Sequence, residues 1–109
     1  MLVLSRNSQS PFVVVGTTAF RLLHLSKSRA KFGVIASSDL PVMRGEMLLS
    51  IINEELGQAI SDEERTALQT VAVLMGDPKA DMEQLCFALQ HPAVQEILYS
   101  TAVKNSAAE

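Results

Sequence analysis

The chain has 109 residues, of which 48% are hydrophobic and 19% are charged, so it fits one small folded unit and is too short for a multidomain enzyme. Its single cysteine excludes an internal disulfide and any multi-cysteine zinc or iron–sulfur site. The net charge of −3 is unevenly divided: residues 1–58 carry six Lys and Arg against four Asp and Glu, whereas residues 59–109 carry three against eight. We therefore expect a mildly basic module, residues 1–58, joined to an acidic one, residues 59–109.

Short runs rich in Val, Leu and Phe, separated by Ser, Gly, Thr and Lys, predict a β module in the first part of the chain. We expect five strands, near residues 1–6, 11–15, 19–25, 29–35 and 40–44. Gly16 with Thr17 and Thr18 predicts the turn between the second and third strands, and residues 26–28 predict a hairpin between the third and fourth. A β module this small buries little surface and has open edges, so we expect a homodimer.

From Gly45 onward the apolar residues recur at helical spacing, which predicts a helix that closes the β module and ends at Gly57. Ser61 and Glu64 have the spacing of a capping box, so a second helix should begin there, and Gly76 should end it. The predicted fold class is therefore mainly β plus α, with a short helical extension after the closing helix.

Two further helices are expected in the extension. Asp77 followed by Pro78 predicts the start of one helix, with Asp77 as its N-cap and proline in its first turn. His91 followed by Pro92 predicts the start of another, after which residues 104–109 should form a frayed tail.

The chemistry-bearing residues outside these elements favour structural roles. His24 and His91 have no partner at metal-ligand spacing, and Cys86 lies on a predicted apolar helix face. No Gly-rich phosphate loop, Ser-His-Asp set or HExxH motif is present, so we expect no enzyme, no cofactor and no metal. Because no apolar stretch has the length of a secretory signal or a membrane span, we expect a cytoplasmic protein without membrane association.

The most specific pattern lies in two separated segments, residues 1–6 (MLVLSR) and residues 34–47 (VIASSDLPVMRGEM). Together they resemble the carbon storage regulator family (CsrA/RsmA). That family opens with Met-Leu-(Val/Ile)-Leu-(Ser/Thr)-Arg and has a Gly-(Val/Ile)-x-Ala-Pro-x-x-(Val/Leu)-x-Val-His-Arg-x-Glu stretch before its helix. The resemblance covers residues 1–56, and the positions that fit the second stretch are Gly33, Ala36, Leu40, Val42, Arg44 and Glu46.

The resemblance implies an intertwined homodimer in which the first strand of one chain lies beside the fifth strand of the other, making a CsrA-like fold with two RNA sites. It implies binding to GGA motifs in hairpin loops of mRNA leaders or small regulatory RNAs, with control of translation or mRNA stability. Single-stranded loops expose base edges that side chains can contact. The RNA-binding residues implied for this chain are Leu4, Arg6, Ala36, Leu40, Val42, Met43 and Arg44.

Arg44 is the strongest candidate for a direct RNA contact, since its planar guanidinium can pair with phosphate or a guanine edge, which contributes roughly 1–3 kcal/mol. Arg6 should lie beside it across the dimer seam. Leu4 and Val42 should provide apolar walls, and residues 36–40 should offer backbone groups to the bases.

Four departures from the family pattern keep a second function open. Asn7 stands where a second basic residue is usual, Gln9-Ser10 where Gly-Glu is usual, Ser37 where proline is usual, and Met43 where histidine is usual. Loss of a cation should weaken RNA binding and reduce its salt dependence. The alternative is a protein-interaction adaptor on a CsrA-like scaffold with weakened RNA binding.

The extension, residues 59–109, has two interpretations. It either adds buried surface to the module or regulates RNA binding, because acidic residues 62–64 could lie near Arg6 or Arg44 and compete with phosphate. It also offers helices through which a protein partner could bind.

Overall fold

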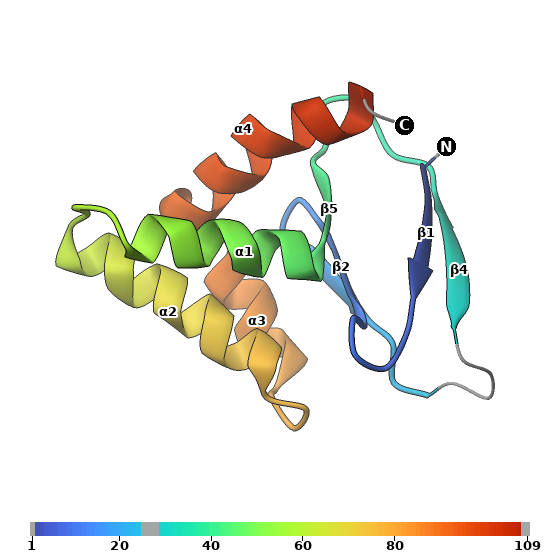
Figure 1. Ribbon diagram of the computed structural model, residues 1–109, viewed down its shortest axis with the longest axis horizontal. Coiled ribbons are helices and arrows are strands. Elements are labelled where there is room, and N and C mark those ends of the chain that lie inside the picture. The colour runs from blue at the N-terminus through green and yellow to red at the C-terminus, as the bar shows by residue number, and fades with distance from the viewer. Residues whose placement is uncertain (1, 25–28, 108–109) are drawn as a thin grey trace.

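The computed structural model describes residues 2–24 and 29–107, with side chains described as far as Thr101. Within these residues five strands are followed by four helices, which confirms the predicted order of elements (Figure 1). The strands are β1 (Leu2–Arg6), β2 (Phe12–Val15), β3 (Thr18–Arg21), β4 (Ala30–Val34) and β5 (Val42–Arg44). The helices are α1 (Gly45–Leu56), α2 (Asp62–Gly76), α3 (Met82–Leu89) and α4 (Pro92–Ala107). No helix in these ranges is long and apolar enough to cross a lipid bilayer.

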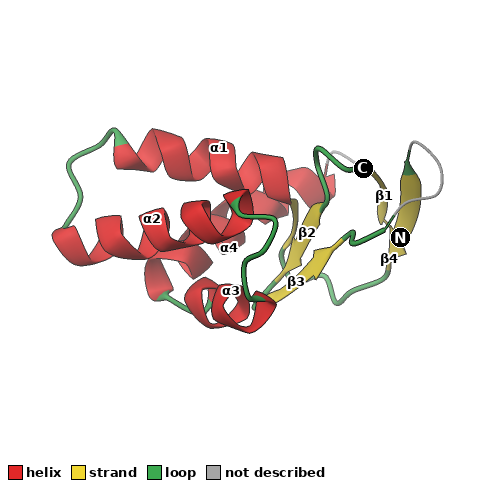
Figure 2. Ribbon diagram, turned by 90° about the horizontal axis from the view of Figure 1, so that it is seen from below, coloured by secondary structure: helices red, strands yellow, loops and turns green. Residues whose placement is uncertain are grey.

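The strands form two antiparallel sheets. One has the order β3-β2-β5, and the other contains β1 and β4. The predicted turn between β2 and β3 is confirmed, because Gly16 takes a φ of 58° there, a conformation that a residue with a Cβ rarely adopts. Figures 1 and 2 show the helices on one side of the β3-β2-β5 sheet and the β1-β4 sheet on the other.

The predicted pairing of the third strand with the fourth is wrong: β3 and β4 lie in different sheets, and the hairpin expected at residues 26–28 lies outside the described residues. In place of β3, β4 pairs with β1, with Leu4 opposite Phe32 and Leu2 opposite Val34. Apolar cross-strand pairs of this kind stabilise a sheet. The periodicity of residues 30–34 predicts a strand, but it does not identify the strand with which β4 pairs.

Two strands, β3 and β5, begin or end more than one residue away from the predicted bounds. β3 ends at Arg21, and residues 22–24 lie outside any strand. β5 begins at Val42, because the backbone N–H of Leu40 donates to the carbonyl of Ser37 in a turn at 2.9 Å. A residue whose N–H closes a turn cannot use that donor in a sheet.

The boundaries of α1 and α2 agree with the prediction. Gly57 follows the end of α1, and the Ser61 Oγ accepts a hydrogen bond from the backbone N–H of Glu64 at 3.1 Å. Three acidic residues occupy the first turn of α2, where the helix dipole favours negative charge. The helix ends at Gly76, as expected.

The predicted start of α3 is wrong. The Asp77 carboxylate accepts the N–H of Lys79 within a turn, and α3 begins only at Met82. Asp81 is the N-cap, because its carboxylate accepts the N–H of Glu83 at 2.9 Å. An aspartate before a proline suits either an N-cap or a turn. Because Asp81, four residues later, is the N-cap of α3, Asp77 forms the turn.

The start of α4 at Pro92 is confirmed, and the Nδ1 of His91 accepts the N–H of Ala93 at 3.1 Å. The frayed tail predicted from residue 104 is wrong, because α4 continues to Ala107. No glycine or proline after Pro92 interrupts the helix. Residues 108 and 109 lie outside the described residues.

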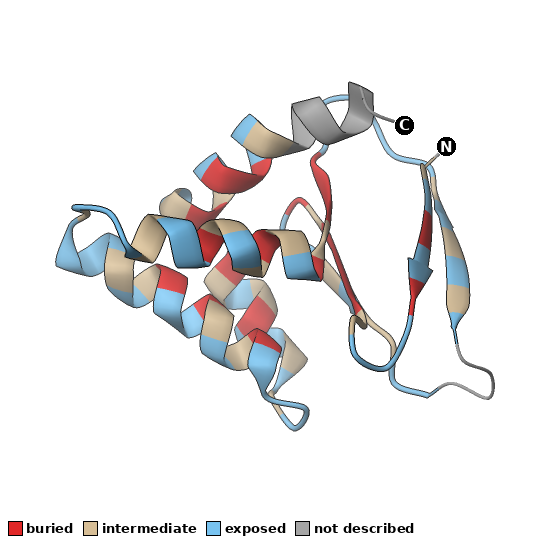
Figure 3. Cartoon of the chain, viewed as in Figure 1, coloured by how far each residue is buried: buried red, intermediate tan, exposed pale blue. Residues whose placement is uncertain are grey.

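The main hydrophobic core joins the β module to the extension (Figure 3). Its buried members are Phe12, Val14, Met43, Leu48, Ile52, Leu68, Val71, Met75, Leu85, Leu89, Val94, Ile97 and Leu98. Eight of these thirteen follow Gln58, so α2, α3 and α4 supply most of the buried surface against which β2, β5 and α1 pack. A smaller cluster of Leu4, Val13 and Val42 fills the space between the two sheets.

Polar contacts also join the extension to the strands. The Arg21 guanidinium donates to the carbonyl of Pro78, and the Nε2 of Gln95 donates to the carbonyls of Gly16 and Leu89. At Gly45 three segments of the chain approach one another closely. A Cβ at this position would lie 2.5 Å from the Cβ of Phe12 and 3.0 Å from the Cε of Met75. Glycine is therefore required where α1, α2 and β2 meet.

Candidate nucleic-acid interface

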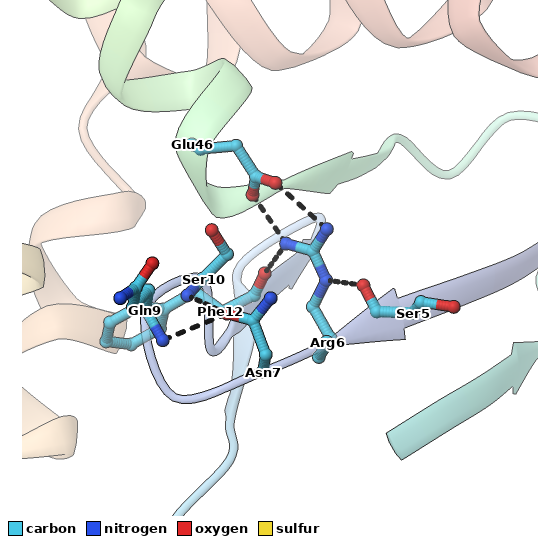
Figure 4. A network of polar contacts seen from close by, with 7 residues as sticks. All are labelled: Ser5, Arg6, Asn7, Gln9, Ser10, Phe12 and Glu46. Carbon is cyan, nitrogen blue, oxygen red and sulfur yellow. Dashed lines mark hydrogen bonds and ion pairs between the residues drawn. The ribbon is translucent and has the colours of Figure 1, made fainter. Parts of the chain in front are cut away.

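The two segments that carry the family resemblance meet at an ion pair between Arg6 and Glu46 (Figure 4). The Nη1 of Arg6 donates to one carboxylate oxygen of Glu46 at 2.5 Å, and the Nη2 donates to the other at 2.9 Å. This bidentate geometry matches the planar guanidinium to the planar carboxylate. The pair joins the end of β1 to the first turn of α1, two residues after Arg44.

Arg6 is almost fully buried, with 4% of its surface exposed. Alternate residues of β1 face the interior, so Leu4 and Arg6 both point inward while Val3 and Ser5 face solvent. The guanidinium also donates to the carbonyls of Phe12 at 3.3 Å and Ser5 at 2.6 Å. Its hydrogen-bonding capacity is thus taken up largely by the protein itself.

The charge of Glu46 is stabilised in this junction. Partial burial by itself raises the pKa of Glu46, but hydrogen bonds from the Arg6 guanidinium and from the backbone, with the nearby charges of Arg6 and Arg44, outweigh it. The pKa of Glu46 is consequently below its ordinary value. Both arginines of the candidate site therefore act on the same carboxylate.

Arg44 is the more accessible of the two arginines. It ends β5, has extended backbone angles, and stands at the N-cap position of α1 with a partly buried side chain. Within the described residues its guanidinium has no hydrogen-bond partner, and its charge acts on the Glu46 carboxylate. Its hydrogen-bond donors are therefore available to a ligand.

The other candidate residues separate into buried and exposed groups. Leu4 and Val42 are buried in the small cluster between the sheets, and Met43 is buried in the main core. Ala36 and Leu40 are exposed in the loop that enters β5 from the end opposite Arg44. The structure thus brings Arg6 and Arg44 together around Glu46, and it places the exposed loop at the other end of β5.

The exposed loop has its own local order. Ser37 Oγ donates to the Asp39 carboxylate, and this hydrogen bond holds the pKa of Asp39 below its ordinary value. The Leu40 side chain lies against Gly16, where an added Cβ would come within 2.9 Å of Leu40 Cδ2. The loop backbone is therefore shaped by a turn and by the β2-β3 hairpin.

Asn7, which stands where the family usually has a second basic residue, has a local structural role (Figure 4). Its Oδ1 accepts the backbone N–H groups of Gln9 and Ser10, both at 2.9 Å. This is a typical asparagine turn, and it closes the connection between β1 and β2.

The acidic residues 62–64 do not lie beside the two arginines in this chain. The end of α2 at Met75 packs near Gly45, at the start of α1, so the first turn of α2 lies toward the opposite end of α1. A helix of 12 residues is about 18 Å long. The predicted position of these carboxylates near Arg6 or Arg44 is therefore wrong within one chain. The Glu63 carboxylate is instead 3.8 Å from the Nε2 of His91.

Glu46 is a residue of the candidate site to which the sequence analysis assigns no role. It fits the family pattern, but Arg6 lies 40 positions away, and no local periodicity links charges at that separation. In the sequence, the opposite charges of the two motif segments are the only feature that points to an ion pair between Arg6 and Glu46.

A comparison with protein-family models, curated proteins and solved structures finds no match for this chain.

Its fold is a mixed β and α arrangement of two antiparallel sheets and a helical layer. In the described residues, no group of three or more His, Cys, Asp or Glu side chains could hold a metal ion. The candidate site is therefore the junction of β1, β5 and α1, where Arg6, Arg44 and Glu46 lie together.

Proposed function

We propose that this protein is a cytoplasmic, non-enzymatic regulator that binds GGA-containing hairpin loops of mRNA or small regulatory RNA and controls translation or mRNA stability. The observation that carries the proposal is the junction itself, where the two segments resembling the carbon storage regulator family come together and Arg44 donates to no acceptor in the described part of the chain. A guanidinium at a strand end, with its donors directed to no acceptor among the described residues, suits a phosphate or a guanine edge.

Arg6 and Arg44 have different roles in this proposal. Arg44 contacts RNA directly. Arg6 fixes β1 to the first turn of α1 through Glu46, and its direct contact with phosphate requires exchange of that carboxylate for the ligand. The exposed backbone of residues 36–40 contacts unpaired bases, while Leu4, Val42 and Met43 support the site from the core.

The proposed assembly is a homodimer with a CsrA-like exchange of strands. Among the described residues β1 pairs only with β4, and β5 pairs only with β2, so one edge of each strand has no strand partner. Free edges of this kind favour pairing with a second chain. Val3, within β1, is 50% exposed, and Ile35, directly after β4, is 85% exposed, so burial of both by a partner would favour association.

The test compares two substitutions that each remove one positive charge. Arg44→Ala and Lys31→Ala are measured in gel shifts with a GGA-loop hairpin and with the same hairpin after its GGA is scrambled. Lys31 is the matched control, because it is exposed on β4, outside the junction. Arg44→Ala should weaken binding by at least about fivefold, or 1 kcal/mol, more than Lys31→Ala. Equal losses, or equal binding of the scrambled hairpin, would indicate a nonspecific basic patch and contradict the proposal.

The second candidate function is a protein-interaction adaptor on the same scaffold. Asn7 favours it, because this side chain is used in the β1-β2 turn where a basic residue would have contacted phosphate. Failure of the GGA hairpin to bind at micromolar concentration, with the chain folded and dimeric, would support the adaptor and contradict RNA regulation.

A further inference from the structure

An open groove with a volume of about 780 Å³ lies between α2 and α3. Its apolar lining comes from Ala67 and Leu74 on α2 and from Phe87 and Ala88 on α3. Phe87 is 78% exposed, so a large aromatic ring stands in water at the edge of the groove. No residue of the β1-β5-α1 junction lines this hollow.

The apolar surface continues around α2. A second hollow of about 260 Å³ shares Thr70 and Leu74 with the groove and includes Val73, which is 69% exposed. Exposed apolar side chains that gather along a hollow, in place of being scattered singly, are typical of a binding surface. Helix α2 therefore offers a continuous apolar strip beside α3.

Carboxylates flank this strip. Asp81 and Glu83, at the start of α3, line the groove. At the other end of α3, His91 lines it, with the Glu63 carboxylate 3.8 Å from its Nε2. The whole segment 59–109 carries three Lys and Arg against eight Asp and Glu. A second copy of this face would bring like charges together, which opposes self-association, whereas a basic partner would be attracted.

We propose that the α2-α3 groove binds a short basic amphipathic helix from another protein. The apolar face of that helix packs on Phe87 and Leu74, and its Lys or Arg side chains lie beside Asp81 and Glu83. Grooves between helices commonly bind amphipathic helices in this way, with the apolar floor giving affinity and the charged rim giving orientation. This surface adds a protein partner to the proposed RNA function without using any residue of the RNA interface.

The test uses the full chain and two synthetic helical peptides of the same pattern, one of Leu and Lys and the other of Leu and Glu. Fluorescence anisotropy at low and moderate salt gives their affinities. Phe87→Ala should weaken binding of the Leu–Lys peptide by about tenfold, since exposed aromatic anchors often contribute this much to an interface. Tyr99→Ala is the matched control, because Tyr99 is a half-exposed aromatic on α4 outside the groove.

A second pair of substitutions tests the charge of the rim. Glu83→Gln should weaken binding by about threefold at low salt and less at moderate salt, because salt screens exposed charges. Glu96→Gln makes the same change of charge on the exposed surface of α4 and should have less than a twofold effect. Phe87 and Glu83 are both exposed, so unchanged melting of all four variants verifies that the fold is intact.

Three results would overturn the proposal. The Leu–Glu peptide could bind as tightly as the Leu–Lys peptide. Phe87→Ala and Tyr99→Ala could weaken binding equally, which would indicate general adhesion. Finally, sedimentation without peptide could reveal self-association that Phe87→Ala abolishes, which would assign the groove to a second copy of the chain.

Discussion

Removal of the Glu46 carboxylate should destabilise the protein, because it leaves the buried Arg6 guanidinium without its counter-charge. The pair contributes two charge-assisted hydrogen bonds, and breaking a fully buried pair typically costs about 3–5 kcal/mol. The Glu46 side chain is 48% exposed, so water screens part of the interaction, and the carbonyls of Phe12 and Ser5 still accept from Arg6. We therefore expect Glu46→Ala to lower the free energy of unfolding by about 2 kcal/mol.

Urea denaturation followed by circular dichroism measures this loss. Glu54→Ala is the control, because Glu54 is exposed on the same helix, and it should change stability by no more than about 0.5 kcal/mol. The double variant Arg6→Met with Glu46→Ala should be more stable than Glu46→Ala alone, since it also removes the buried charge. A loss for Glu46→Ala no larger than that of the control would refute the assignment of the pair as a stabilising contact.

The same pair predicts a pH dependence. Because the pKa of Glu46 is lowered in the folded state, its stabilising effect is fully present above the unfolded value of 4.5 and is lost as the pH falls through the lowered folded value. The stability difference between the natural chain and Glu46→Gln should be constant near neutral pH and should shrink below pH 4.5. A difference that grows on acidification would contradict this reasoning.

Three further predictions concern the core and the assembly. Gly45→Ala should destabilise the protein by about 1–3 kcal/mol, because its Cβ would overlap Phe12, whereas Gly76→Ala, with nothing within 4 Å, should be neutral or slightly stabilising. Equal melting temperatures for the two variants would contradict the close approach. Leu98→Ala should cost about 2–5 kcal/mol in one cooperative transition that includes the strands, and separate transitions for strands and helices would argue against a shared core. Light scattering at micromolar concentration should give the mass of a homodimer, and a stable monomer would rule out the proposed assembly.

The sequence predicts the local elements of this fold well, because their signals are local. The Ser61 cap, the Gly16 turn and the start of α1 at Gly45 depend on a few neighbouring residues, and the structure has all three. Asp77 shows the limit of such signals. Its side chain can begin a helix or close a turn, and the outcome depends on a competing cap at Asp81.

Long-range pairing is not encoded in any local pattern. The alternation of β4 predicts an apolar face but not that this face meets β1, and the charges of Arg6 and Glu46 do not indicate that they meet each other. The position of residues 62–64 likewise depends on the antiparallel packing of α1 and α2, which places them away from Arg44. Of the candidate site, the sequence therefore indicates the residues but not their burial or their partners.

The shared core has a consequence for the synthesis of the chain on the ribosome. Eight of its thirteen buried residues are translated after Gln58, so Phe12, Met43 and the free edges of β1 and β5 emerge before the helices that cover the sheet exist. At about 5–20 residues per second, translation of residues 59–109 takes roughly 3–10 seconds. During that interval the apolar residues and unpaired edges of the nascent strands are exposed to solvent. A chaperone or a neighbouring nascent chain could therefore bind them before the helices form.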